Sequence, residues 1–127
     1  MRALSGLLVC ALAFPVWAGG QWRVVSDTPA ETISVELSSL ERGADRVSFR
    51  LRHALRDGQV DQSSRRPVRE ILAKRMVDCS TRRVATLSRA VFSNDDAMIN
   101  YQAVRMAQAE WQAMPKDDPL FKLVCKP

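Results

Sequence analysis

Arginines are the side chains in this sequence best placed to do chemistry. Three alternate along one segment and two more follow in a polar stretch: Arg46, Arg50, Arg52, Arg65 and Arg66. A guanidinium offers a planar fork of donors that binds carboxylate, phosphate or sulfate groups. If the polar stretch folds back, the five arginines form one basic patch for acidic glycans, lipopolysaccharide phosphates or an acidic protein. The alternative is a solvated face, neutralised locally by Glu36, Asp45 or Glu70.

Other chemistry is sparse. The only histidine is His53, and no nucleophile motif, Gly-rich phosphate loop or cluster of metal ligands accompanies it. We therefore predict a protein that is not an enzyme and that holds no cofactor or metal. His53 as a haem or metal ligand is the weaker alternative to a hydrogen-bonded histidine at the edge of a sheet.

The N-terminus predicts export. Arg2 precedes an apolar stretch from residue 4 to residue 16, and Val16-Trp17-Ala18 places small residues where a signal peptidase reads them. This order of charge, apolar run and small residues is typical of a secretory signal peptide, so we predict that residues 1–18 are removed. The run is too short for a transmembrane helix, and no second run follows. We expect a periplasmic or cell-surface-associated protein with no transmembrane segment.

Cys10 lies inside this apolar stretch. Val9 precedes it, where a lipoprotein signal would have a small residue, and the chain stays apolar afterwards. We therefore expect Cys10 to be discarded with the signal peptide. A lipid anchor on Cys10 is the alternative.

The chain that remains, residues 19–127, has the length of one domain. It carries 18 basic and 14 acidic residues, a net charge of +4, and 14 of the 18 cations are Arg. The Arg bias favours contact with anions, although a GC-rich genome would produce the same bias. A modest charge with interspersed acids is no indication of nucleic-acid binding.

Two cysteines remain after cleavage, Cys79 and Cys125. An even number of cysteines in an exported domain predicts a disulfide, and two allow only one pairing. Free thiols or a metal site are weaker alternatives, because the chain has no CxxC motif. The bridge would close a loop of about 46 residues and stabilise the domain by about 4 kcal/mol.

The pattern of apolar residues predicts mainly β-structure. Residues 32–37 alternate apolar and polar, and residues 46–55 alternate most clearly, with Val47, Phe49, Leu51 and Leu55 on one face and the arginines on the other. Residues 22–25, 82–92 and 98–106 are further strand candidates. Turns are expected at 26–29, 41–45 and 93–96, with an exposed loop at 57–67. Residues 68–79 are ambiguous, because their apolar residues also fit helical spacing.

One helix is expected at the C-terminus. Asp118 is a favourable N-cap, and Pro119 follows at the first helical position, where its missing N–H costs nothing. Cys125 falls on the apolar face of this short helix, so its disulfide would hold the helix against the sheet. We expect Trp111 to pack under this helix, with an exposed binding aromatic as the alternative.

Several of these residues occur in an order that resembles the surface-adhesin protein E family. They are Trp22 near the mature N-terminus, Asp78-Cys79 at the end of a central segment, then Trp111, Pro115 and Cys125. The resemblance implies an α+β, mainly β fold: an antiparallel sheet of about six strands with a short C-terminal helix tethered by the disulfide. It also implies that residues 68–79 form a strand. The entry to the last helix, Pro115-Lys116-Asp117-Asp118, departs from the Pro-Gly-Ser usual in the family but keeps its capping chemistry.

Two functions remain open. The resemblance implies a non-enzymatic exported binding protein that attaches to host or environmental surface molecules, such as acidic glycans or extracellular proteins. The founding adhesins resemble lipoproteins at their N-termini, whereas this chain does not. The second function is therefore a soluble periplasmic structural or accessory protein without an adhesive role. The oligomeric state is not predicted.

Overall fold

The computed structural model describes residues 21–56 and 58–125. The predicted signal peptide, residues 1–18 with Cys10, lies outside the described residues. The elements in chain order are β1 (Trp22–Asp27), β2 (Glu31–Glu36), the 3-10 turn η1 (Leu37–Ser39), β3 (Glu41–Arg42), β4 (Arg46–Leu55), β5 (Val68–Asp78), β6 (Arg83–Ser93), β7 (Met98–Ala103), the 3-10 turn η2 (Met106–Gln108), β8 (Gln112–Ala113) and α1 (Pro119–Val124).

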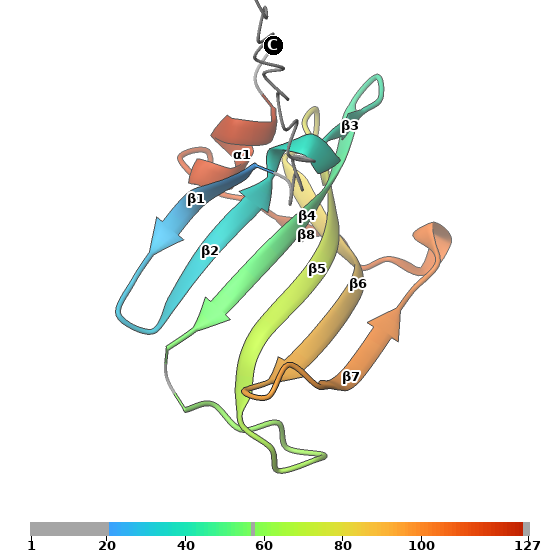
Figure 1. The fold of residues 1–127 in the computed structure, drawn as a ribbon. Coiled ribbons are helices and arrows are strands. Elements are labelled where there is room, and N and C mark those ends of the chain that lie inside the picture. Colours follow the sequence, from blue (N-terminus) through green and yellow to red (C-terminus); the bar gives the residue numbers. More distant parts are fainter. Residues whose placement is uncertain (1–20, 57, 126–127) are drawn as a thin grey trace, which may run out of the picture.

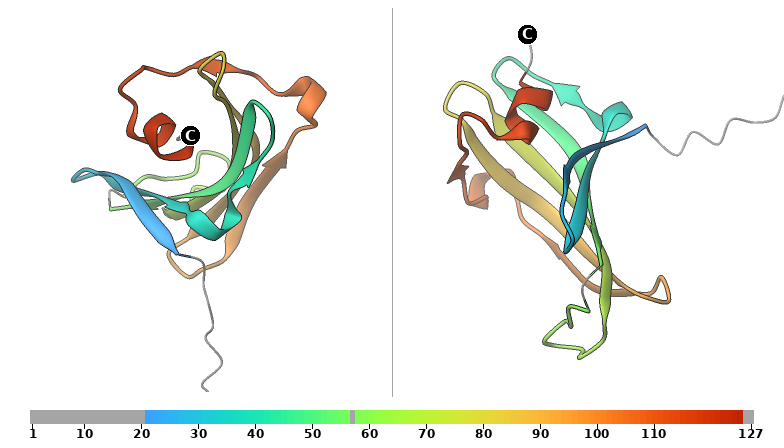
Figure 2. Two further views of the ribbon diagram at one scale, coloured as in Figure 1. Left: turned by 90° about the horizontal axis from the view of Figure 1, so that it is seen from above. Right: turned by 90° about the vertical axis from the view of Figure 1, so that its left-hand side faces the viewer.

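One antiparallel sheet makes up most of the structure (Figure 1). Its main path is β1-β2-β4-β5-β6-β7, and two short strands extend it where β3 pairs with β4 and β8 pairs with β6. The sheet curls into a half-barrel around α1, as the view from above shows (Figure 2). The expected fold class is therefore confirmed. We call the sheet face toward α1 the inner face and the opposite face the outer face.

β4 forms because its residues alternate strictly. Val47, Phe49 and Leu51 are buried on the inner face, whereas Arg46 and Arg50 are exposed on the outer face. A pleated strand sends successive side chains to opposite faces, so this alternation places the apolar set against α1. The expected turn at 41–45 is shorter in the structure, because Glu41 and Arg42 pair with β4 before the chain turns.

β5 confirms that residues 68–78 form a strand. Its apolar residues lie on both faces: Ala73 and Val77 are on the inner face, and Leu72 and Met76 are on the outer face. A central strand with apolar residues on both sides lacks a clean period of two. That arrangement explains why the segment also fits helical spacing.

The core lies between the inner face and α1. Leu120 and Val124 of α1 pack with Val35, Phe49 and Leu51 from the sheet. Asp118 caps the helix as expected, because one of its carboxylate oxygens accepts a hydrogen bond from the backbone N–H of Leu120 at 2.8 Å. No helix within the described part of the chain is long and apolar enough to cross a membrane.

Two further contacts hold the C-terminal end of α1. Cys79, which directly follows β5, forms a disulfide with Cys125, and their Cα atoms lie 5.6 Å apart. The Arg42 guanidinium donates a hydrogen bond of 2.5 Å to the backbone carbonyl of Val124. A six-residue helix is marginal in water by itself, so these contacts and the buried side chains stabilise it.

Candidate functional site

The outer face collects the arginines of β4. In the register of β4 and β5, Arg50 lies directly opposite Lys74, and Ser88 of β6 lies opposite Lys74 on the other side. Side chains directly opposite on adjacent strands have Cβ atoms about 5 Å apart. Arg50, Lys74 and Ser88 therefore form a row across three strands.

This row lines a groove on the outer face. We call it the outer groove, and its volume is about 460 Å³. Its lining combines hydroxyl groups, two cations, one carboxylate and small apolar groups: Ser38, Ser39, Glu41, Ser48, Phe49, Arg50, Leu72, Ala73, Lys74, Ser88 and Ala90. Segment 37–42, which contains η1 and β3, contributes one side of the groove. Its position is fixed in part because the backbone N–H of Arg50 donates to the hydroxyl of Ser39 at 2.8 Å.

The two cations of the outer groove are incompletely neutralised. Arg50 Nε lies 3.8 Å from a carboxylate oxygen of Glu36, and the Arg50 side chain is 66% exposed. Lys74 is exposed and forms no ion pair with any of residues 21–56 or 58–125. Like charges directly opposite on adjacent strands repel each other. An anion placed between Arg50 and Lys74 would remove that repulsion.

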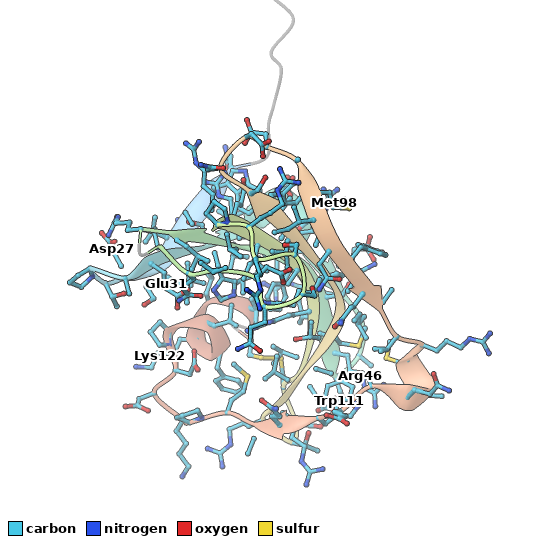
Figure 3. All side chains as sticks on the ribbon, turned by 90° about the horizontal axis from the view of Figure 1, so that it is seen from below. Asp27, Glu31, Arg46, Met98, Trp111 and Lys122 are labelled. Carbon is cyan, nitrogen blue, oxygen red and sulfur yellow. A yellow bond between two sulfur atoms is a disulfide. The ribbon has the colours of Figure 1, made fainter. Side chains whose placement is uncertain are left out.

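Arg46 and Arg52 are engaged within the protein. The Arg46 guanidinium lies 4.9 Å from the centre of a Trp111 ring and 3.5 Å from a carboxylate oxygen of Asp78. Arg52 stacks over Trp22 in the same way, at 4.4 Å. Such cation–π contacts hold guanidinium groups flat against the rings. The expectation that Trp111 packs under the last helix is wrong, because Trp111 is half-buried against Arg46 and is not part of the core around α1 (Figure 3).

Asp78 stabilises the turn that follows β5. One carboxylate oxygen accepts hydrogen bonds from the backbone N–H groups of Ser80 and Thr81, at 3.0 and 3.1 Å, and from the Ser80 hydroxyl at 2.7 Å. These bonds, with that of the Ser80 hydroxyl first, lower the pKa of Asp78 to about 2. The charged carboxylate thus fixes the turn that carries Cys79.

The loop arginines Arg65 and Arg66 lie outside the outer groove. The exposed loop begins after the last residue of β4, about 30 Å along the strand from Arg46 at a rise of about 3.4 Å per residue. Arg66 reaches the turn after β6 instead, where one guanidinium nitrogen lies 3.0 Å from a carboxylate oxygen of Asp95. Arg65 is exposed and adopts a φ of 57°. Neither Arg65 nor Arg66 lines the outer groove, so the structure does not bring all five predicted arginines into that groove.

His53 lies on the inner face near the end of β4. Its Nδ1 lies 3.1 Å from a carboxylate oxygen of Glu31, and 16% of its side chain is exposed. This contact matches a hydrogen-bonded histidine. Across residues 21–56 and 58–125, no group of three or more His, Cys, Asp or Glu side chains could hold a metal ion.

Lys74 is the residue of the outer groove that the sequence did not reveal. It lies in the segment whose secondary structure was ambiguous, so the face it occupies could not be assigned. Once residues 68–78 are paired with β4 in the observed register, alternation places Lys74 on the face of Arg50.

Comparison with known proteins gives one family and one fold. A family model described as surface-adhesin protein E matches residues 22–126. Haemophilus influenzae protein E in crystal form II has 14% identity and a TM-score of 0.57, over 84% of this chain and 87% of that chain. A second structure of H. influenzae protein E gives a TM-score of 0.55 at 14% identity, over 84% and 82%. Similarity at this identity shows the fold alone. The search of curated proteins found no match.

Proposed function

We propose that this chain, which belongs to the surface-adhesin protein E family, is an exported, non-enzymatic protein that binds acidic polymers through its outer groove. The family is one of surface adhesins and is not an enzyme class. The observation that carries the proposal is the direct opposition of Arg50 and Lys74, two cations of which only Arg50 has an ion pair, at 3.8 Å to Glu36, within the described residues.

The chemistry of the outer groove favours sulfated or carboxylated glycans. Arg50 offers a planar fork and Lys74 a point charge, while Ser39, Ser48 and Ser88 add hydroxyl groups within the same groove. A glycan supplies anionic groups and many hydroxyl groups, so both kinds of lining group find partners. The groove is open, which suits a polymer that extends beyond it.

Heparin is the probe for the first test. We expect wild-type protein to bind heparin with an affinity that falls as the salt concentration rises, because exposed charges are screened by salt. The double variant Arg50→Glu/Lys74→Glu should lose at least about tenfold in affinity, about 1.4 kcal/mol, since each charge-assisted contact is worth that much or more. The measurement is isothermal titration at two salt concentrations.

A matched control separates the groove from net charge. Lys116→Glu/Lys122→Glu changes the net charge by the same amount, and both residues are exposed and do not line the groove, with Lys122 on α1 (Figure 3). This control should bind almost as well as wild type. An equal loss in both variants would reduce the binding to net charge. No binding by the wild type would favour a periplasmic structural or accessory role.

Export is a separate part of the proposal and rests on the sequence of residues 1–18. We expect the native protein to begin at Gly19 and to comprise the single domain 19–127. Intact mass of protein from the cell envelope checks this start. A mass that starts at an acylated Cys10 would instead place the protein on a membrane.

A further inference from the structure

Arg75 is a cation on the inner, mainly apolar face of the sheet. It lies near the centre of β5, between Phe49 of β4 and Thr86 of β6 in the register, and on the same face as the fully buried Val77. Its side chain therefore points to the inner face, toward α1. Arg75 as a whole is half-buried, and the N–H groups that water cannot reach need an acceptor within the protein.

The structure does not provide that partner. The Nε of Arg75 is buried and has no hydrogen-bond acceptor among the described residues. No ion pair joins Arg75 to a carboxylate of residues 21–56 or 58–125. Burial lowers the pKa of Arg75, because desolvation disfavours the charged form.

The two carboxylates that attract Arg75 have other contacts as well. Asp118 and Glu31 attract Arg75, and Arg89 repels it. Asp118, however, caps α1 through the N–H of Leu120, and Glu31 contacts His53. Each of these contacts uses one carboxylate oxygen, and neither residue forms an ion pair with Arg75.

Arg75 lies between two cavities. The larger, of about 270 Å³, is lined mainly by apolar groups, among them Val25, Ile33, Leu51, Pro119 and Leu120, and Asp118 also borders it. The smaller, of about 180 Å³, is polar and is bordered by Thr86, Glu110 and Gln112. Arg75 lines both cavities and is the cation of each lining.

A local irregularity of the sheet accompanies this arrangement. The register of β5 and β6 shifts between Lys74 and Arg75, so that Leu87 is an additional residue on β6. Bulges of this kind change the direction of neighbouring side chains and are common beside binding sites. Lys74, on the outer face, and Arg75, on the inner face, are the two residues of β5 that lie opposite this bulge.

We propose that the larger cavity binds a small organic acid whose carboxylate contacts the Arg75 guanidinium and whose apolar body packs against Val25, Ile33 and Leu120. A carboxylate in the cavity would offset the charge of Arg75, because a guanidinium can donate two parallel hydrogen bonds to one carboxylate. The cavity holds about nine groups of the size of a water molecule, each of about 30 Å³. An aryl-alkanoic or medium-chain acid has that size. This proposal does not depend on the outer groove.

The test compares an acid with its amide. 4-Phenylbutanoate and 4-phenylbutanamide are titrated into the wild-type protein, and backbone amide chemical shifts are followed by NMR. We expect saturable shifts at residues around the larger cavity and at least tenfold tighter binding of the acid. Equal affinity for both compounds, or no saturable binding of either, would overturn the proposal.

Variants assign the effect to Arg75. Arg75→Met keeps the length of the side chain without its charge and should abolish the preference for the acid, whereas Lys122→Met, on the exposed side of α1, should retain it. Should Arg75→Met fail to fold, Ile33→Phe reduces the cavity and leaves Arg75 in place, and it should weaken binding of the acid at least tenfold. Unchanged binding in both variants would contradict the site.

A peptide distinguishes the source of the carboxylate. A short peptide that ends in Leu-Phe is added with a free or an amidated C-terminus. Weaker binding of the free peptide than of 4-phenylbutanoate is expected from the size of the cavity. Tighter binding of the free peptide would overturn the small-molecule assignment in favour of a protein C-terminus.

Discussion

The two faces of the sheet place arginine side chains in different environments. On the outer face, Arg50 is 66% exposed and lies in an open groove, with water available to its charge. On the inner face, Arg75 is part of the wall beneath α1, and its Nε is buried without an acceptor. The outer face can therefore lose or gain charge at small cost to the fold. The inner face depends on packing, on α1 and on the bridge that holds α1.

The largest expected effect comes from the disulfide, which belongs to the inner face. Cys79→Ser/Cys125→Ser should lower the free energy of unfolding by about 4 kcal/mol, because a 46-residue loop is no longer closed in the unfolded chain. Urea denaturation of the variant and of the oxidised wild type measures the difference. The outer-groove double variant Arg50→Glu/Lys74→Glu serves as the comparison and should stay within about 0.5 kcal/mol of the wild type.

An intermediate effect is expected from a pair of leucines on opposite faces. Leu120→Ala removes a buried side chain of α1 and should cost about 3 kcal/mol, since it leaves a cavity in the core. Leu72→Ala, on the outer face, removes a half-buried side chain and should cost about 1 kcal/mol. Thermal and urea denaturation of both variants provides the comparison. Similar costs for the two would contradict the division into a packed and a solvated face.

The smallest effect has the opposite sign. Lys74→Glu replaces a like-charge pair with Arg50 by an attractive one and should stabilise the fold by about 0.5 kcal/mol. The same change should weaken heparin binding, because it removes a cation from the outer groove. Stability and binding would then move in opposite directions, as expected where a residue serves a ligand and not the fold. Lys122→Glu, away from the groove, should change neither quantity appreciably.

The sequence allowed the sheet to be predicted where one face is buried and the other solvated. β4 alternates cleanly for that reason, and the caps of α1 are local signals that need no tertiary information. The match to the surface-adhesin protein E family likewise confirms a resemblance carried by the order of Trp22, Asp78, Cys79 and Cys125. β5 could not be assigned from its own residues, since both of its faces carry apolar side chains.

The residues that line the groove and the cavities were harder to predict, because their positions depend on how the strands pair and where the loops lie. The grouping of Arg65 and Arg66 with the β4 arginines required the loop to fold back, whereas Arg66 contacts Asp95 at the turn after β6. Lys74 and Arg75 are adjacent in the sequence, so a strand places them on opposite faces, but only the pairing of β5 with β4 shows which face each one takes. Trp111 contacts Arg46 from a segment without regular pattern, so no periodicity could place it.

The order of the strands has a consequence for the time course of folding. Along β4, β5, β6 and β7, every strand pairs with the one that precedes it in the chain, and β1 pairs with β2. Such local pairings close short loops and form early. The segment that carries α1 comes last in the chain. We therefore expect the meander to form while Cys79 still carries a free thiol, which stays accessible to oxidants until the segment with Cys125 folds against it.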